Sequence, residues 1–241
     1  MTRGINAESP PPSEHDRRPI AARRLAVFAA MAAALARARV RPNAISIAGM
    51  LAAIGAGGLL AMSGAGEAGS LSERAMLLAA AGLVQARLLA NLLDGMVAVE
   101  GGLRSPTGEL YNEVPDRVSD VAVLIGAGYA AGAWPELGYL AAIGAVLVAY
   151  SRAIGKGCGF AADFRGPMAK QQRMFIVTLA CVWMGCAPVA WRGAWMLAGA
   201  ERGVMAAALA IITIGCALTF LRRLGLVGAR LCAADQSRSA A

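Results

Sequence analysis

The sequence has few aromatic and few charged residues for its length. Aromatic residues make up 5% and charged residues 16% of the 241 positions, whereas 58% are hydrophobic. A soluble domain usually carries about 25% charged residues, so this composition excludes an ordinary soluble globular protein. Small residues such as Ala and Gly are abundant, and they allow helices to pack closely in a bilayer. The composition therefore predicts a single, all-α, polytopic membrane domain.

The usual ligands of transition metals are also scarce. There is one histidine, His15, and the cysteines show no metal-binding spacing along the chain. We interpret the cysteines as small hydrophobic residues inside or next to apolar segments. They are Cys158, Cys181, Cys186, Cys216 and Cys232.

Long apolar runs are present instead. Each is close to the roughly 20 residues that cross a hydrocarbon core of about 30 Å as a helix. Only closed helices satisfy the backbone in lipid, so we expect six transmembrane helices. The predicted spans are Ile45–Met62, Ala75–Val99, Gly108–Gly132, Leu137–Ile154, Met174–Val189 and Val204–Leu221.

The basic residues are distributed very unevenly about these spans. Of 23 Lys and Arg, eighteen fall on the side of the two termini and three, Arg74, Arg192 and Arg202, on the other. Cytoplasmic loops of membrane proteins are enriched in Lys and Arg. The pattern predicts cytoplasmic termini in the inner (cytoplasmic) membrane. It also accounts for the net charge of +8, so we expect no nucleic-acid partner.

The composition divides the chain into four parts. Residues 1–16 are polar and proline-rich and are predicted to be disordered. Residues 17–42 have basic flanks around a short apolar stretch, which favours an amphipathic helix lying on the cytoplasmic surface over a signal peptide. Residues 43–224 form the six-helix membrane domain, and residues 225–241 form a cytoplasmic C-terminal tail.

Polar residues gather where the second and third predicted spans meet. Asn91 and Asp94 are three residues apart, and Asn112, Asp116 and Asp120 recur every four residues, so each set shares one helix face. Ionisable groups in membrane spans are costly and usually functional. Carboxylate and amide oxygens are the ligands that Mg²⁺ and Mn²⁺ prefer. The pattern predicts a metal, proton or substrate site at this hairpin, with oxygen ligands of the kind that suits a hard divalent cation.

The spacing resembles the signature of the CDP-alcohol phosphotransferases, D-x2-D-G-x2-A-R-x8-G-x3-D-x3-D. Asp94-Gly95, Ala98, Gly108 and Asp116 fall at the intervals of that signature. The segment Arg41–Ile45 (RPNAI) resembles the Pro-Asn segment that precedes the family's first span. The resemblance covers most of the chain and implies six spans with a cytoplasmic N-terminal helix.

Three positions depart from the signature. Asn91 and Asn112 stand where the family has Asp, and Val99 stands where it has Arg. In the family the four acidic residues bind divalent metal and the last is proposed as the general base. The resemblance thus implies that Asp94 and Asp116 bind metal and that Asp116 deprotonates the acceptor hydroxyl. Asn91 and Asn112 still offer neutral, weaker ligands, so one or two Mg²⁺ or Mn²⁺ ions are expected.

Asp120 is an additional carboxylate one turn beyond Asp116. It either joins the metal-binding set or, in a shifted register that ranks second, forms the terminal pair with Asp116. The family's cytidine-nucleotide site maps onto residues of the same hairpin and of the first span. These are Asn43, Asp94, Gly95, Ala98 and Gly108.

Basic residues follow the fourth span on the same side as the hairpin. In relatives with phosphorylated acceptors, residues at this junction hold the acceptor phosphate, which makes Arg152, Lys170 and Arg173 candidates. The positive-inside rule explains them equally well.

Three functions remain open from the sequence. The first is a transferase of phospholipid biosynthesis that passes a phosphatidyl group from CDP-diacylglycerol, or another CDP-alcohol, to a polar alcohol and releases CMP. The second is a non-catalytic relative that binds lipid or nucleotide, suggested by the two Asn substitutions. The third is an ion or proton transporter. The absence of acidic residues from the last three predicted spans argues against this function. The small-residue surfaces would permit a homodimer.

Overall fold

Long helices joined by short connections make up most of the protein. A computed structural model describes residues 26–100, 102, 107–161, 165–197 and 199–239. Its elements are α1 (Ala26–Arg37), α2 (Pro42–Ser63), α3 (Leu71–Glu100), α4 (Gly108–Gly128), α5 (Pro135–Gly157), α6 (Lys170–Cys186), a 3-10 helix (Val189–Trp191), β1 (Trp195–Leu197), β2 (Ala200–Arg202) and α7 (Val204–Ser239). The predicted tail at 1–16 and residues 17–25 of the predicted interfacial segment lie outside the described residues.

Helices α2 to α7 coincide with the six predicted apolar segments, and the all-α class is confirmed. Pro42 and Pro135 begin α2 and α5, where their missing N–H groups cost no hydrogen bond. The main difference is at the C-terminus, where α7 continues to Ser239 through the segment predicted as a tail. Between α6 and α7 the chain forms the antiparallel pair β1–β2, which was not predicted.

Four of these helices are long and apolar enough to cross a membrane, namely α2, α3, α5 and α7. Helix α4 is long enough but carries several charged residues, and α6 has only 17 residues. Six helices therefore stand where six spans were predicted, and four of them have the length and composition of a span.

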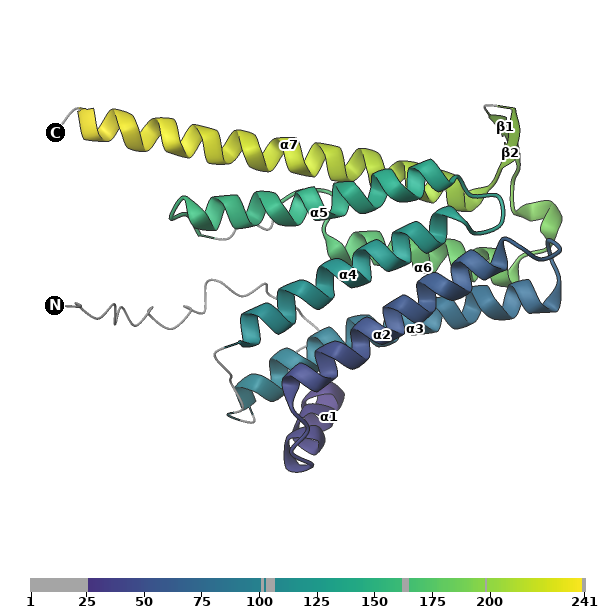
Figure 1. The fold of residues 1–241 in the computed structure, drawn as a ribbon, viewed down its shortest axis with the longest axis horizontal. Helices are drawn as coiled ribbons and strands as arrows, with labels where there is room; N and C mark the ends of the chain where they lie inside the picture. The colour runs from purple at the N-terminus through teal and green to yellow at the C-terminus, as the bar shows by residue number, and fades with distance from the viewer. Residues whose placement is uncertain (1–25, 101, 103–106, 162–164, 198, 240–241) are drawn as a thin grey trace, which may run out of the picture.

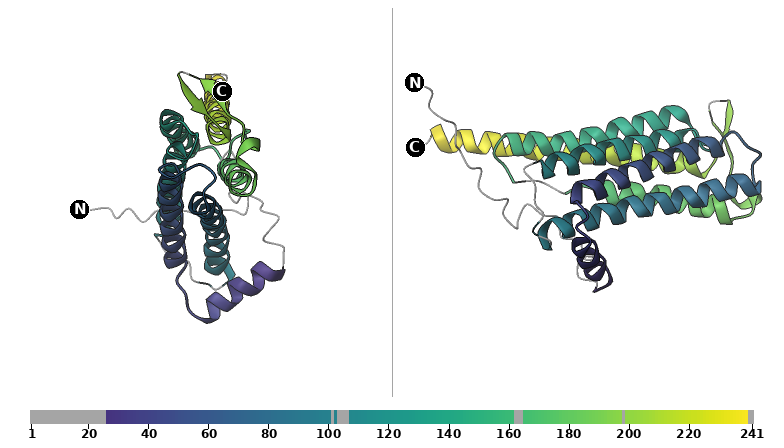
Figure 2. Two further views of the ribbon diagram at one scale, coloured as in Figure 1. Left: turned by 90° about the vertical axis from the view of Figure 1, so that its right-hand side faces the viewer. Right: turned by 60° about the horizontal axis from the view of Figure 1, so that its bottom comes forward.

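Helices α2 to α7 run along the long axis of the molecule (Figure 1). Helix α2 packs extensively against both α3 and α4, whereas α5 packs against α4 and α7, and α6 against α3 and α7. Helix α1 lies across the bundle axis (Figure 2), where Ala32 is buried against residues of α3 such as Leu93 and Val97. The orientation of α1 is the one expected of a helix at a membrane surface.

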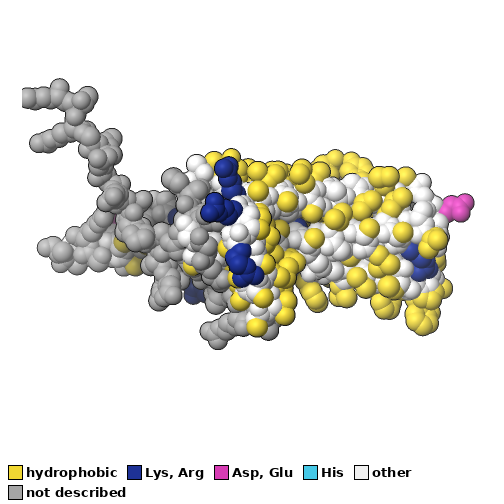
Figure 3. All heavy atoms as spheres, turned by 90° about the horizontal axis from the view of Figure 1, so that it is seen from below, with side chains coloured by type: hydrophobic (Ala, Val, Ile, Leu, Met, Phe, Trp, Pro, Cys, Tyr) yellow, Lys and Arg dark blue, Asp and Glu magenta, His cyan; other side chains and the backbone are white. Residues whose placement is uncertain are grey.

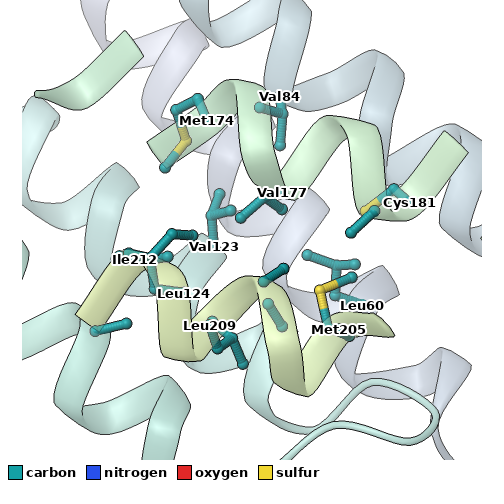
Figure 4. Close-up of a cluster of buried hydrophobic side chains, with 14 of the residues drawn as sticks. Leu60, Val84, Val123, Leu124, Met174, Val177, Cys181, Met205, Leu209 and Ile212 are labelled. Carbon is teal, nitrogen blue, oxygen red and sulfur yellow. The ribbon is translucent and has the colours of Figure 1, made fainter. Parts of the chain in front are cut away.

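The core between the helices is built largely from small side chains. Figure 4 shows Leu60, Val123, Val177 and Leu209 meeting from α2, α4, α6 and α7. The backbones approach closely where Gly126 of α4 crosses Gly57 of α2, since a Cβ atom built on Gly126 would lie 2.6 Å from Gly57 Cα. Such small-residue crossings are typical of helices packed in membranes.

The outer surface is strongly apolar. Leu51, Ile143 and Ile214, from α2, α5 and α7, are 59%, 57% and 62% exposed. Figure 3 shows hydrophobic side chains over much of one face, with a group of Lys and Arg near the end where several residues are not described. An apolar surface of this extent indicates a lipid-facing protein.

The end of the bundle that carries the β1–β2 hairpin is held by a buried ion pair. Glu73 of α3 accepts hydrogen bonds from Arg192 Nη1 at 2.8 Å on both carboxylate oxygens. Their side chains are 0% and 9% exposed. This pair lies far along α3 from Asp94 and offers a control for experiments on the opposite end.

Candidate active site

Asp94 is buried near the C-terminal end of α3 and is held by α2. The Ser46 hydroxyl donates a hydrogen bond to Asp94 Oδ2 at 2.6 Å. Ser46 lies one turn after Asn43, and both residues are in the first turns of α2, which begins at Pro42. The beginning of α2 therefore orients the first predicted metal ligand.

Asp116 lies in the first half of α4 and is 8% exposed. Its Oδ1 atom accepts hydrogen bonds from two cations, the Arg87 guanidinium of α3 and the Lys170 ammonium at the start of α6, the latter at 2.5 Å. Asp94 lies two turns after Arg87 on the same face of α3. Three helices thus bring the Asp116 carboxylate and two cations to one place, on the face of α3 that carries Asp94.

Arg87 is held in this position from three sides. Its Nε donates to Ser119 Oγ at 2.9 Å, and Ser119 in turn donates to the carbonyl of Pro115 at 2.6 Å. Pro115 interrupts the hydrogen bonding of α4 next to Asp116, which is a usual cause of local distortion in a helix. Gly49 of α2 provides the space, because a Cβ there would lie 2.9 Å from Arg87 Nη1.

The predicted faces of α3 and α4 meet mainly through these side chains. Helix α2 packs extensively against both helices, whereas direct contact between α3 and α4 is sparse in the described residues. The bonds from Arg87 to Asp116 and Ser119 are the polar bridges that the structure shows between them. An arginine, reaching across from one helix to the other, therefore connects the two polar faces.

The remaining predicted residues of the hairpin differ in exposure. Gly95, Ala98, Gly108 and Asn91 are half-buried, whereas Asn112 is exposed. These positions are compatible with contact to a ligand that comes from the aqueous side.

Glu113 takes part in surface ion pairs near the start of α4. It accepts a hydrogen bond from Arg117 at 3.0 Å, four residues on, as the spacing predicts. It also pairs with Arg152 of α5, one of the candidates for the acceptor phosphate. Arg152 therefore stands beside the site, within reach of α4.

Asp120 and Arg173 form a second buried pair. Their carboxylate and guanidinium groups are 2.5 Å apart, with side chains 1% and 2% exposed. Arg173 Nη1 also donates to the Met168 carbonyl at 3.1 Å, and the Met168 amide donates to Thr219 of α7. These contacts hold the segment before α6 and so position Lys170.

The donor set can be tested against a divalent ion. Among the described residues, no group of three or more His, Cys, Asp or Glu side chains lies together in a way that could hold a metal. The signature positions offer the carboxylate oxygens of Asp94 and Asp116 and the amide oxygens of Asn91 and Asn112. Asp116 Oδ1 already serves two cations, and Oδ2 lies 3.8 Å from Arg117. An ion at these positions would therefore have two carboxylates as possible ligands, in place of the four of the signature, together with two neutral amides.

Sequence reasoning missed Arg87 and Ser46, although both left a signal. Arg87 is inside an apolar span, where a charge needs a partner, and it lies one turn before Asn91 on the face of Asp94. Ser46 is three residues after Asn43 and so shares its face of α2. Their partners could not be read from the chain, because they are on other helices.

Comparisons with known proteins support the fold. No protein-family model matches the chain, and no curated protein matches it by sequence. Solved structures of phosphatidylinositol phosphate synthase (PgsA1) from Mycobacterium tuberculosis do match it. The complex with manganese and citrate is 21% identical and has a TM-score of 0.65, covering 83% of this chain and 88% of that one.

Two further structures of the same synthase agree. The form with CDP-DAG bound is 21% identical with a TM-score of 0.66, covering 83% of this chain and 93% of the synthase. The apo form is 22% identical with a TM-score of 0.62, over 82% and 94%. The synthase is a CDP-alcohol phosphotransferase, and the chain described here shares its fold.

Proposed function

We propose that this protein is a membrane phosphatidyltransferase that uses a CDP-linked donor and a polar alcohol acceptor. The donor we propose is CDP-diacylglycerol. The observation that carries the proposal is that Asp116 is bound by Arg87, from the face of α3 that carries Asp94, with both carboxylates at signature positions in a bundle with the synthase fold. The synthase was crystallised with CDP-DAG and with manganese, which supports the same class of donor and ion here.

Asp116 is the group that accepts the proton of the acceptor hydroxyl. Its Oδ1 atom accepts hydrogen bonds from Arg87 and Lys170, so Oδ2 is the oxygen that takes the proton in this proposal. In this proposal Lys170 and Arg152 bind a phosphate on the acceptor, which is supported by their contacts with Asp116 and Glu113 of α4. Arg173 is 1% exposed and bound to Asp120, so phosphate binding by Arg173 would require this pair to open.

A divalent ion would be held by Asp94 and Asp116 with amide oxygens from Asn91 and Asn112. When bound, such an ion neutralises phosphate charge and stabilises the leaving group. Asp120 would join this set only by leaving Arg173. The half-buried Asn43, Gly95, Ala98 and Gly108 would line the nucleotide site, as the signature implies.

The site lies at the end of the bundle that holds most of the basic residues. We place this end, and both termini, on the cytoplasmic side of the inner membrane. All six long helices then cross the bilayer and α1 lies at its surface. A donor lipid could keep its tails in the bilayer while its nucleotide and the acceptor remain in water.

A second candidate function is a non-catalytic member that binds lipid or nucleotide. The specific observation in its favour is that Arg87 and Lys170 already occupy Asp116 Oδ1, in a chain with Asn at two signature positions. If these ion pairs do not open, Oδ1 of Asp116 is not available to a metal ion or to the acceptor.

The test is CMP release by the purified chain in lipid vesicles, with Mg²⁺ or Mn²⁺, radiolabelled CDP-diacylglycerol and a panel of alcohols. We expect CMP release with at least one acceptor and its loss in Asp116→Ala. The matched control is Glu73→Gln, which removes a buried, arginine-paired carboxylate at the other end of α3 and should keep activity. Donor binding without turnover over the whole panel would favour the non-catalytic alternative.

A further inference from the structure

Helix α6 is short for a helix that crosses a membrane. Its 17 residues end at Cys186, and at about 1.5 Å per residue they are about 26 Å long. The hydrocarbon core of a bilayer is about 30 Å thick. With α6 crossing the bilayer, as proposed above, a chain segment next to α6 has to lie at the edge of the core. The exposed side chains of that segment should then be apolar.

The connection from α6 to α7 exposes four large apolar side chains, which we call the distal patch. Val189, Trp191, Trp195 and Met196 are 49%, 68%, 51% and 74% exposed. They lie at the end of the bundle opposite the candidate site, where the strands β1 and β2 run across the helix axes (Figures 1 and 2). The α2–α3 connection at the same end, residues 64–70, has the polar sequence GAGEAGS. The distal patch is therefore a property of the α6–α7 connection.

The two arginines of this connection are bound to the body of the protein. Arg192 is 7% exposed and binds the buried Glu73 of α3. Arg202 of β2 pairs with Trp195 in the hairpin register and donates a hydrogen bond to the Ala133 carbonyl at 2.8 Å. Charged side chains of a water-facing segment are usually the exposed ones, whereas here the large apolar side chains are exposed. These bonds hold the hairpin on the bundle, so the distal patch is presented by a fixed backbone.

We propose that the distal patch is a membrane anchor, which lies in the boundary between headgroups and acyl chains of the leaflet opposite the candidate site. Tryptophan favours this boundary, and the patch continues the lipid-facing apolar surface of the helices. Strand β1 supplies Trp195 and Met196, whereas β2 carries Glu201 and Arg202, so the apolar strand enters lipid and the polar strand stays at its surface. With α1 at the other membrane surface, the anchor fixes the depth of the bundle. The proposal rests on the crossing of α6 and not on the reaction.

The experiment uses the full-length chain in phosphatidylcholine vesicles whose acyl chains carry bromine, a contact quencher of tryptophan fluorescence, either near the headgroup or near the chain end. The variant Trp134→Phe/Trp183→Phe/Trp191→Phe keeps Trp195 as its one tryptophan. We expect Trp195 to lose most of its emission with bromine near the headgroup, less with bromine near the chain end, and little with iodide in the water. The matched control adds Trp195→Phe and Glu67→Trp, which moves the reporter to the polar α2–α3 connection. Iodide should quench this reporter and bromine should hardly affect it.

Three results would overturn the proposal. Quenching of Trp195 by iodide and not by bromine would place the hairpin in water, and quenching by neither would place it against a second copy or another protein. Equal quenching by bromine in Trp195 and in the Glu67→Trp reporter would show that contact with lipid belongs to this whole end of the bundle. The native chain gives a test without substitutions, because its four tryptophans all lie at this end: native emission that bromine leaves unchanged would also refute the anchor. No outcome depends on CMP release, so the anchor and the proposed function can fail separately.

Discussion

Replacing Arg173 with Met tests whether the buried pair with Asp120 holds the protein together. The two groups are 2.5 Å apart and their side chains are 2% and 1% exposed. Removing one partner of such a pair leaves an uncompensated buried charge, which costs about 3–5 kcal/mol. We expect Arg173→Met to lower the free energy of unfolding by that amount, measured by denaturant titration in detergent micelles followed by tryptophan fluorescence.

The double variant Arg173→Met/Asp120→Leu should recover most of this loss. Apolar residues of similar volume often replace a buried ion pair without a net cost. The coupling between the two positions then follows from the double-mutant cycle, as the difference between the double variant and the sum of the single ones. A double variant as unstable as the worse single one would show that the contacts of Arg173 beyond Asp120 dominate.

Glu113→Gln is the control. Glu113 also pairs with arginines, Arg117 and Arg152, but its side chain is 39% exposed and theirs are 26% and 22% exposed. Ion pairs near the surface contribute about 0–1 kcal/mol. If Arg173→Met changed the free energy of unfolding by as little as Glu113→Gln, the buried-pair reasoning would be refuted. Arg173 would then be available for the acceptor phosphate, as the sequence suggested.

Two further predictions concern packing and metal affinity. Gly126→Ala should destabilise the bundle by about 1–3 kcal/mol, since its Cβ would lie 2.6 Å from Gly57 Cα; Gly58→Ala, with no neighbour within 4 Å, should be almost neutral in the same denaturant titration. Ser46→Ala removes the hydroxyl that orients Asp94 and should weaken Mn²⁺ binding at least about tenfold in a titration. An unchanged Mn²⁺ affinity would mean that Asp94 needs no support from α2.

Much of the fold could be predicted from hydropathy because a membrane helix satisfies its backbone within its own segment. The six apolar runs became α2 to α7, with most ends within about one turn. The exception is α7, which continues to Ser239 past the last apolar run, where the hydropathy signal weakens. The short β1–β2 pair after α6 was not predicted. That α4 and α6 also cross the membrane stays a prediction.

The sequence by itself determined which residues share a helix face, since that depends only on their spacing. It placed Asp94 and Asp116 on polar faces and Glu113 beside Arg117, four residues apart. Only the tertiary structure decided their partners. Asp116 is bound by Arg87, 29 residues earlier, and by Lys170, 54 residues later, and such pairings depend on how α2, α3, α4 and α6 pack and rotate against one another. Helical periodicity carries no information about that packing, because it is set by side-chain volumes at contacts between segments far apart in the chain.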